Sequence, residues 1–167
     1  MKPSLNTYEI VAQAPFGAVG VRAKGEFVTE IALLPPALAR SAKSLNVHHV
    51  LTPQIQTYLK NPRAHFNIKH EVAGTPYQRL VWQAISAIPC GETRTYAELA
   101  QQIGSGQRAV ANACGANPFP LVVPCHRVVA KNGLGGFMQG FEGGLEVKKW
   151  LLAHCLLYTS PSPRDCS

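Results

Sequence analysis

Three short runs within the first 33 positions are strand-like, and in the last of them apolar positions alternate. The runs cover residues 8–13, 18–23 and 27–33, and they are separated by Ala14-Pro15-Phe16-Gly17 and by Lys24-Gly25-Glu26. Alternation with a period of two, bounded by Gly- or Pro-containing turns, is typical of half-buried strands joined as hairpins. The pattern predicts a three-stranded antiparallel meander.

Two helices are expected after the meander. Residues 35–44 favour a short helix, and Thr52-Pro53 favours the start of a longer one, with Thr as N-cap and Pro at the first helical position. Apolar residues then recur at helical spacing on one face, at Ile55, Tyr58 and Leu59.

Four histidines lie in the same half of the chain, at His48, His49, His65 and His70. No cysteine or carboxylate cluster accompanies them, as a metal site requires. We expect solvated or singly hydrogen-bonded histidines here, and we assign residues 1–72 a structural role.

The pattern changes to a helical period after residue 73. Thr75-Pro76 repeats the helix-start signal, and six apolar positions then follow one helical face: Tyr77, Leu80, Val81, Ala84, Ile85 and Ile88. This stripe predicts the core helix of a second domain. Cys90, in the turn that follows, is expected to be inert.

Two shorter helices are predicted next. Thr95 with Glu98 three residues later forms a capping box, and Gly104-Ser105-Gly106 ends the helix that it opens. Residues 107–115 then form a second helix. A pair of short helices across a glycine turn is typical of a helix-turn-helix, although many such hairpins bind nothing. The second helix carries one long cation, Arg108, among small residues, which allows close approach to a nucleic acid groove.

Composition and charge limit the class of protein. The formal charge of +7 suits a polyanionic partner, and the five cysteines show no spacing typical of a disulfide framework or a zinc site. No signal peptide or membrane-spanning run is seen, so we expect a soluble protein of a reducing compartment.

A last helix is predicted over residues 145–154, with Leu145, Trp150, Leu151 and Leu152 facing inward. Residues 156–167 are Ser/Pro-rich and aperiodic, and we expect a disordered tail that is not native to the domain.

Candidate chemistry is concentrated in the stretch 117–129, Asn-Pro-Phe-Pro-Leu-Val-Val-Pro-Cys-His-Arg-Val-Val. Its three prolines predict a stiff, extended approach to Cys125, which is followed by an imidazole and a guanidinium. A cationic neighbour favours the nucleophilic thiolate. Adjacent residues of an extended chain point to opposite faces, so cooperation between Cys125 and His126 requires a turn or a bridging water.

The motif Asn-Pro-x-Pro-x-x-x-Pro-Cys-His-Arg-Val resembles the signature of the methylated-DNA–protein-cysteine methyltransferases, the O6-alkylguanine-DNA alkyltransferases. The resemblance runs from about Thr75 to His154, and it is weaker over the first seventy residues. It implies an α+β fold: an N-terminal antiparallel β-sheet with helices, ribonuclease H-like, in residues 1–72, and a mostly helical domain with a winged helix-turn-helix in residues 73–155.

The resemblance also implies a reaction. The family moves an alkyl group from guanine O6 irreversibly onto its own cysteine, here Cys125, and flips the nucleotide out of the duplex to reach it. His126 matches the family residue that takes the thiol proton through a water, and Tyr96 matches the residue that donates a hydrogen bond to guanine N3. Asn117 matches the residue whose turn joins the recognition helix to the active-site segment. Arg108 matches the residue that fills the gap left by the flipped base.

Further residues are assigned to the site by the same resemblance. The expected DNA contacts are Thr95, Tyr96, Gln107, Arg108, Ala109, Asn112 and Gly115. The expected substrate pocket comprises Pro124, the carbonyls at Cys125 and Val128, and a glycine-rich wall with Phe141 and Glu142. The resemblance implies that the protein uses no metal and no cofactor. It implies a monomer that binds double-stranded DNA containing O6-alkylguanine, with O4-alkylthymine as an open question, and that has no obligatory protein or membrane partner. It also implies a cytoplasmic or nuclear location.

One departure from the family pattern bears on activity. Family members carry Glu after the Ala-His that ends the last helix, whereas Ala153-His154 is followed here by Cys155. The carboxylate that would orient His126 is absent, which predicts a recognisable but impaired site. Two alternatives stay open: a non-catalytic protein that binds alkylated DNA, and a thiol hydrolase that uses Cys125 and His126.

Overall fold

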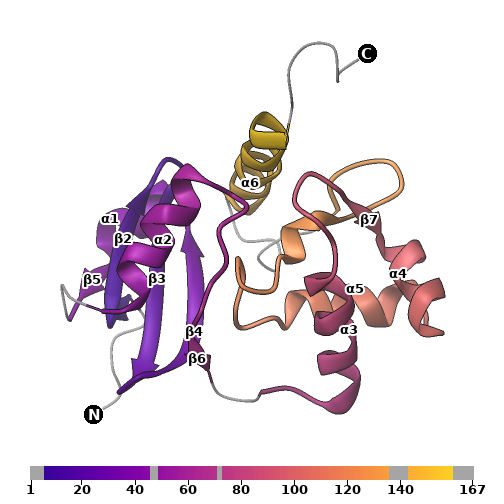
Figure 1. Cartoon of the computed structure of the whole chain (residues 1–167), viewed down its shortest axis with the longest axis horizontal. Helices are drawn as coiled ribbons and strands as arrows, with labels where there is room; N and C mark the ends of the chain where they lie inside the picture. Colours follow the sequence, from indigo (N-terminus) through magenta and orange to yellow (C-terminus); the bar gives the residue numbers. More distant parts are fainter. Residues whose placement is uncertain (1–5, 46–48, 71–72, 136–142, 160–167) are drawn as a thin grey trace. The chain divides into compact units, whose positions relative to one another are not determined.

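The structure is a computed structural model that describes residues 6–45, 49–70, 73–135 and 143–159. The chain divides into two compact units, residues 1–72 and 73–167 (Figure 1). The first contains a mixed sheet flanked by helices and the second is mostly helical, so the α+β prediction is confirmed.

The first unit is built on a four-stranded sheet with the order β2-β3-β4-β6. Its first three strands pair antiparallel, as the sequence predicts, while β6 pairs parallel with β4 and was not expected. A second, two-stranded parallel pair joins β1 to β5. The strands are β1 (Thr7–Tyr8), β2 (Ile10–Ala14), β3 (Gly17–Lys24), β4 (Phe27–Leu34), β5 (Lys43–Ser44) and β6 (Lys69–His70).

Both helices of the first unit differ in extent from the prediction. Helix α1 spans only Pro36–Ser41, because the following residues pair as β5. Helix α2 (Leu51–Lys60) begins before the predicted cap: Val50 is its N-cap, and the Thr52 hydroxyl is buried without a hydrogen-bond partner among the described residues. Burial of Leu51 at the start of the helix explains the shift, since it adds a fully buried apolar side chain to the face of Ile55 and Tyr58.

The described histidines of this unit are exposed or hydrogen-bonded to the backbone, as the sequence predicts. His49 accepts a hydrogen bond at Nδ1 from the backbone N–H of Leu51 (3.1 Å), and His65 and His70 are exposed. No group of three or more metal-ligating side chains gathers among the residues that the structure describes. His48 lies outside them.

The second unit is organised around helix α3 (Pro76–Ser86). Thr75 caps it with the full capping box, in which the N3 partner is Gln78. The predicted stripe is confirmed at Val81, Ile85 and Ile88, which are buried. It is wrong at Leu80, which is 46% exposed; Trp82 is buried instead.

Trp82 explains this difference. Its indole N–H donates to the Ala113 carbonyl across 2.8 Å, so a hydrogen bond to the neighbouring helix turns the buried face of α3 toward Trp82.

Two short helices, α4 (Tyr96–Ile103) and α5 (Gln107–Gly115), pack against α3 as predicted. Gly104 ends α4 in the left-handed conformation (φ 70°). A parallel pair of short strands, β7 (Arg94–Thr95) and β8 (Val128–Val129), joins the start of α4 to the chain after Cys125. No local sequence signal indicated this pairing.

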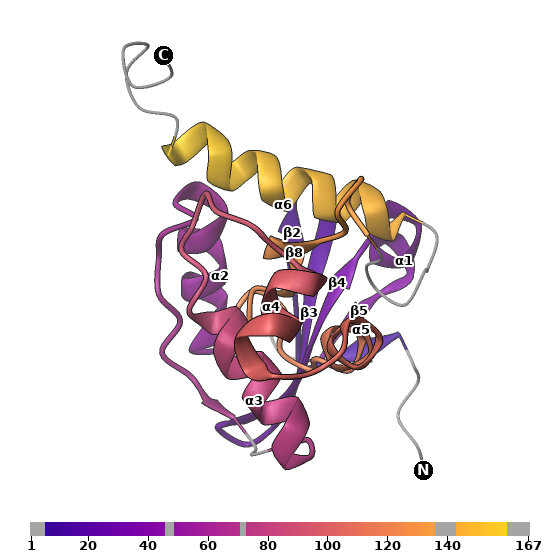
Figure 2. The same ribbon diagram turned by 90° about the vertical axis from the view of Figure 1, so that its right-hand side faces the viewer.

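Helix α6 (Gly144–Thr159) ends the described chain and runs past β8 as one continuous helix (Figure 2). It is longer than predicted: residues 156–159, assigned above to a disordered tail, form its last turn, and residues 160–167 lie outside the described part. Val147, Lys148, Leu151 and Cys155 form its buried face, whereas the predicted inward residue Leu145 is 46% exposed. No helix in the described residues is long and apolar enough to cross a membrane.

Candidate active site

The segment before Cys125 is a closed loop, which corrects the predicted extended approach. The Val123 N–H donates to the Phe119 carbonyl (2.8 Å), and Leu121 has a φ of 77°. This left-handed conformation is unfavourable for a non-glycine residue. It is held in place because the side chains of Phe119 and Leu121 are buried.

Cys125 begins a short 3-10 turn (Cys125–Arg127), so the chain bends at the point where cooperation with His126 requires it. The Cys125 N–H donates to the Val123 carbonyl (2.7 Å), and the residue is 8% exposed. Burial raises the pKa of the Cys125 thiol, and a side-chain hydrogen bond with Asn117 and the charge of Lys148 partly offset this. The raised pKa keeps the thiol mostly protonated at pH 7, so nucleophilic attack needs a group that promotes its ionisation.

Lys148 is the functional candidate that the sequence interpretation missed. It is fully buried on α6, and its Nζ donates to the Val128 carbonyl across 2.7 Å. Desolvation lowers its pKa to about 8, and the Cys125 and Cys114 thiols act in the opposite direction. A cation on the apolar face of the last helix, between Val147 and Leu151, was the signal that could have revealed it.

His126 is fully buried beside Cys125, and neither ring nitrogen has a hydrogen-bond partner among the described residues. Desolvation, followed by the positive charges of Arg127, Lys148 and His154, lowers its pKa to about 3. An imidazole in this setting is neutral at pH 7, and no described group selects its tautomer.

Arg127 contacts Cys155, which occupies the position where the family pattern has Glu. Its Nη1 donates to the Ile88 carbonyl (2.8 Å) and its Nη2 to the Cys155 sulfur (3.8 Å), while Nε is buried without a partner among the described residues. Cys155 itself is only 2% exposed. Cys155 therefore lies in a buried region beside the Arg127 guanidinium, which a carboxylate would suit better than a thiol.

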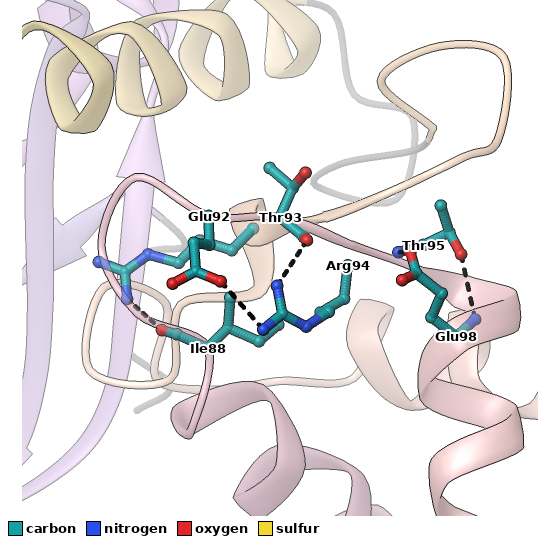
Figure 3. Close-up of polar contacts among 7 residues, drawn as sticks. Ile88, Glu92, Thr93, Arg94, Thr95 and Glu98 are labelled. Carbon is teal, nitrogen blue, oxygen red and sulfur yellow. Dashed lines mark hydrogen bonds and ion pairs between the residues drawn. The ribbon is translucent and has the colours of Figure 1, made fainter. Parts of the chain in front are cut away.

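The start of α4 lies next to this segment through the β7–β8 pair, in which Thr95 is opposite Val129. Thr95 caps α4: its hydroxyl accepts from the Glu98 N–H (3.0 Å) and its own N–H donates to the Glu98 carboxylate (2.9 Å), as Figure 3 shows. The Thr95 hydrogen bonds hold the pKa of the Glu98 carboxyl below its usual range. Arg94 bridges Glu92 and the Thr93 carbonyl in the same view.

Tyr96 follows as the first residue of α4 and is partly buried. A side chain at Gly135 would collide with its ring, since a Cβ there would lie 2.8 Å from Cε2. The loop that contains Gly135 therefore passes closely over Tyr96. Phe141 and Glu142, expected farther along this loop, lie outside the described residues.

Helix α5 presents one face to solvent and the other to the core. Val110 and Ala113 are buried, and the candidate contacts are all exposed on the outer side: Gln107, Arg108, Ala109, Asn112 and Gly115. The structure thus places them on one accessible surface. Pro124 and Val128 are buried within the Cys125 segment.

The helical second unit corresponds to a known class of DNA-binding domain. The family profile described as "6-O-methylguanine DNA methyltransferase, DNA binding domain" matches residues 76–154. A methylated-DNA–protein-cysteine methyltransferase of Mycobacterium bovis is 33% identical over 158 residues, which are 91% of this chain and 92% of the relative. This chain belongs to the methylated-DNA–protein-cysteine methyltransferase family.

Other relatives match over a shorter part of their length. A probable methylated-DNA–protein-cysteine methyltransferase of Acanthamoeba polyphaga mimivirus is 54% identical over 101 residues, 59% of this chain and 65% of the relative. The Salmonella typhimurium protein is 53% identical over 83 residues, 48% of this chain and 47% of the relative. The chain thus spans between about half and two thirds of these two relatives.

Solved structures agree along almost the whole chain. The crystal structure of Mycobacterium tuberculosis O6-methylguanine methyltransferase has a TM-score of 0.73 at 29% identity, covering 93% of this chain and 96% of that one. The M. tuberculosis protein in complex with DNA has a TM-score of 0.70 at 32% identity, covering 89% and 91%.

Proposed function

We propose that this protein is a single-turnover DNA repair methyltransferase that moves an alkyl group from O6-alkylguanine in double-stranded DNA onto Cys125. The observation that carries the proposal is the surroundings of the buried Cys125 thiol. Cys125 begins a turn that also contains the buried His126 imidazole, and the positive charge of the buried Lys148 favours its thiolate. The family relationship and the exposed α5 surface support it. It requires no metal or cofactor, because the alkyl group, the acceptor and the leaving group are present once DNA binds.

The chemistry is an in-line displacement at a saturated carbon. Cys125 loses its proton, the sulfur attacks the alkyl carbon, and the O6–carbon bond breaks with its electron pair remaining on guanine. An unperturbed thiol has a pKa of about 8.5 and is only a few per cent ionised at neutral pH. Burial raises the pKa of Cys125 further, which lowers the fraction of thiolate at neutral pH.

The surrounding residues are assigned to binding and proton transfer. His126 receives the thiol proton through a water, Tyr96 donates to guanine N3 as charge grows on the ring, and Asn117 holds the approach to Cys125. One lone pair of the Val128 carbonyl accepts a hydrogen bond from Lys148, and the second can accept one from the exocyclic amine of guanine. Phe141 and Glu142 complete the pocket.

The helices α4 and α5 act as a helix-turn-helix, with β7 and β8 as part of its wing. Arg108 enters the stack at the flipped nucleotide, while Thr95, Gln107, Ala109, Asn112 and Gly115 lie against the DNA. The protein binds as a monomer, in the cytoplasm or, in a eukaryote, in the nucleus. The first unit, with its meander and parallel edge strand, has a ribonuclease H-like arrangement and a structural role.

The reaction is slower than in a member of the family that carries Glu at position 155. His126 has a pKa of about 3 and no orienting partner among the described residues, and both features oppose proton acceptance. The same observation favours a second candidate, a protein that binds alkylated DNA without repairing it. A thiol hydrolase is less favoured, because hydrolysis of a small ester would not require the exposed α5 surface that carries Arg108.

Intact mass after incubation with an O6-methylguanine oligonucleotide tests the proposal. A gain of one methyl group that stops at one equivalent, maps to Cys125 and disappears in Cys125→Ser is expected. Binding of the oligonucleotide without a mass change would support the second candidate. A methyl group on Cys90, Cys114, Cys155 or Cys166 would overturn the assignment of Cys125, and repeated ester turnover would support the hydrolase.

A further inference from the structure

Lys148 carries a charge in a place where charges are costly. The whole residue is shielded from solvent, and its Nζ donates to the neutral carbonyl of Val128. Burial of an ammonium group costs hydration energy, and an anionic group close by offsets that cost more effectively than a neutral carbonyl does. The chemistry of the groups around Lys148 therefore decides how its charge is used.

The titratable groups that act on Lys148 come from two elements packed around it. Cys125 lies on the 3-10 turn and Cys114 on α5, and a thiolate at either position favours the ammonium. The positive charge of Lys148 in turn favours the thiolate of both cysteines and opposes protonation of His126. Among the described residues, the two thiols are thus the groups that raise the pKa of Lys148. Each can supply an opposing negative charge when it ionises.

Of the two thiols, Cys125 is the better partner. Asn117 forms a hydrogen bond that favours its ionised form, and the 3-10 turn that Cys125 begins leads directly to Val128, whose carbonyl Lys148 holds. Burial, followed by the charge of the Cys125 thiol, raises the pKa of Cys114 to about 12, so its thiolate is less accessible.

We infer that Lys148 is a positioning residue for alkyl transfer: its buried ammonium supplies the positive charge beside which Cys125 ionises, and it fixes the Val128 carbonyl. The inference rests on the proposed function of Cys125. The S–H bond of Cys125 breaks, its proton passes through the bridging water to His126, and Lys148 keeps its own protons. The sulfur retains the electron pair with which it attacks the alkyl carbon.

Lys148 supplies the positive charge that the resting His126 imidazole lacks. With a pKa of about 3, His126 is neutral across the physiological range and provides no charge for a thiolate. Lys148, with a pKa of about 8, is cationic at pH 7 and loses its charge at alkaline pH. The help that it gives to Cys125 is therefore present below about pH 8 and lost above it.

The test compares Lys148→Gln with Lys149→Gln. The first substitution would keep a donor for the Val128 carbonyl without the charge. Lys149 is a neighbour whose side chain is 59% exposed and pairs with Glu146. The rate at which iodoacetamide modifies Cys125, followed by peptide mass spectrometry across pH, reports its thiolate. Removing a nearby opposite charge is expected to raise the apparent pKa of Cys125 by about 1–3 units, which slows modification at pH 7 about tenfold or more. Lys149→Gln should leave the profile unchanged.

Lys148→Arg should restore most of the profile, because it returns the charge. An unchanged Cys125 pKa in Lys148→Gln would overturn the inference and leave Lys148 a structural donor. A methyl-uptake assay on the same proteins separates the two claims. If the wild type takes up no methyl group while the pKa of Cys125 shifts in Lys148→Gln, the proposed function fails and the charge interaction stands.

A second measurement avoids any folding defect in the lysine variants. Titration of Lys148 by NMR, through its ε-carbon, is compared between the wild type and the nearly isosteric Cys125→Ser. Since the Cys125 thiolate raises the pKa of Lys148, that pKa should fall when the thiol is removed. Equal pKa values would contradict the pairing.

Discussion

The Asn117 side chain donates from Nδ2 to the Val123 carbonyl across 2.9 Å, and this contact closes the loop that leads to Cys125. Its Oδ1 accepts from the Phe119 N–H, also at 2.9 Å. One amide thus satisfies two backbone groups on opposite sides of a loop that includes the left-handed Leu121. The position of Cys125 depends on a side chain far back in the same loop.

Asn117→Ala should therefore destabilise the protein and slow alkyl transfer. Leaving partly buried backbone groups unsatisfied costs about 1–3 kcal/mol of the free energy of unfolding. Urea unfolding, with tryptophan fluorescence as the signal, measures this in the second unit, which contains both Trp82 and Trp150. Asn132→Ala, at an exposed site, is the matched control and should change the free energy little. Equal stability in the two variants would show that the loop holds without Asn117.

Arg108→Ala should slow repair of duplex DNA far more than reaction with free O6-benzylguanine. Only the duplex requires a nucleotide to be flipped out, at an energy of about a few kcal/mol. Arg108 is exposed on α5, so its loss should not disturb the core, and Arg79→Ala on α3 controls for loss of one positive charge. Single-turnover rates with both substrates give the comparison. Equal slowing of both reactions would assign Arg108 a structural role.

Local sequence signals predicted the elements whose energetics are local. The predicted N-cap at Thr75 and the predicted capping box at Thr95 both form, because a cap and its partner are only three residues apart. The hydrophobic period of two predicted the meander for the same reason. Gly104 ended α4 as predicted, since glycine adopts the left-handed conformation without strain.

Features that depend on partners far along the chain were not predictable in the same way. Leu80 fits the predicted helical stripe better than Trp82, but the hydrogen bond from the Trp82 indole to the Ala113 carbonyl, 31 residues away, favours burial of Trp82. The β7–β8 pair and the contact of Lys148 with Val128 likewise join segments distant in sequence. For the site, the motif led to Cys125 and His126, but it contained no information about the lysine behind them.

Glu98→Gln should flatten the dependence of stability on pH in the acidic range. The hydrogen bonds from Thr95 hold the pKa of the Glu98 carboxyl below its usual range. Such a group stabilises the folded state above the unfolded-state pKa, and the contribution is lost as the pH falls through the folded-state pKa. Glutamine can accept the same hydrogen bond but does not titrate. Urea unfolding between neutral and acidic pH should show a shallower decline for the variant; identical slopes would contradict this role of Glu98.

Cys155→Glu should speed methyl transfer near neutral pH. A carboxylate at this position would lie beside the Arg127 guanidinium, which now contacts the Cys155 sulfur at 3.8 Å. It would also offer an acceptor to the nitrogens of His126 and Arg127 that have no partner among the described residues. It would raise the pKa of His126 from about 3 and select the tautomer whose other nitrogen accepts the thiol proton. General-base help is worth roughly 10²–10⁴-fold, which sets the upper limit of the gain.

The pH dependence distinguishes this mechanism from a general improvement in folding. The gain should be largest near pH 7 and shrink at alkaline pH, where Cys125 ionises without a base. Leu156→Glu, which adds the same charge one residue later at a site that is 57% exposed, should give no gain because its carboxylate faces solvent. Single-turnover rates against pH for the wild type and both variants measure the effect. Coincident curves for the wild type and Cys155→Glu at pH 7 would mean either that another residue already orients His126 or that the imidazole is not the base.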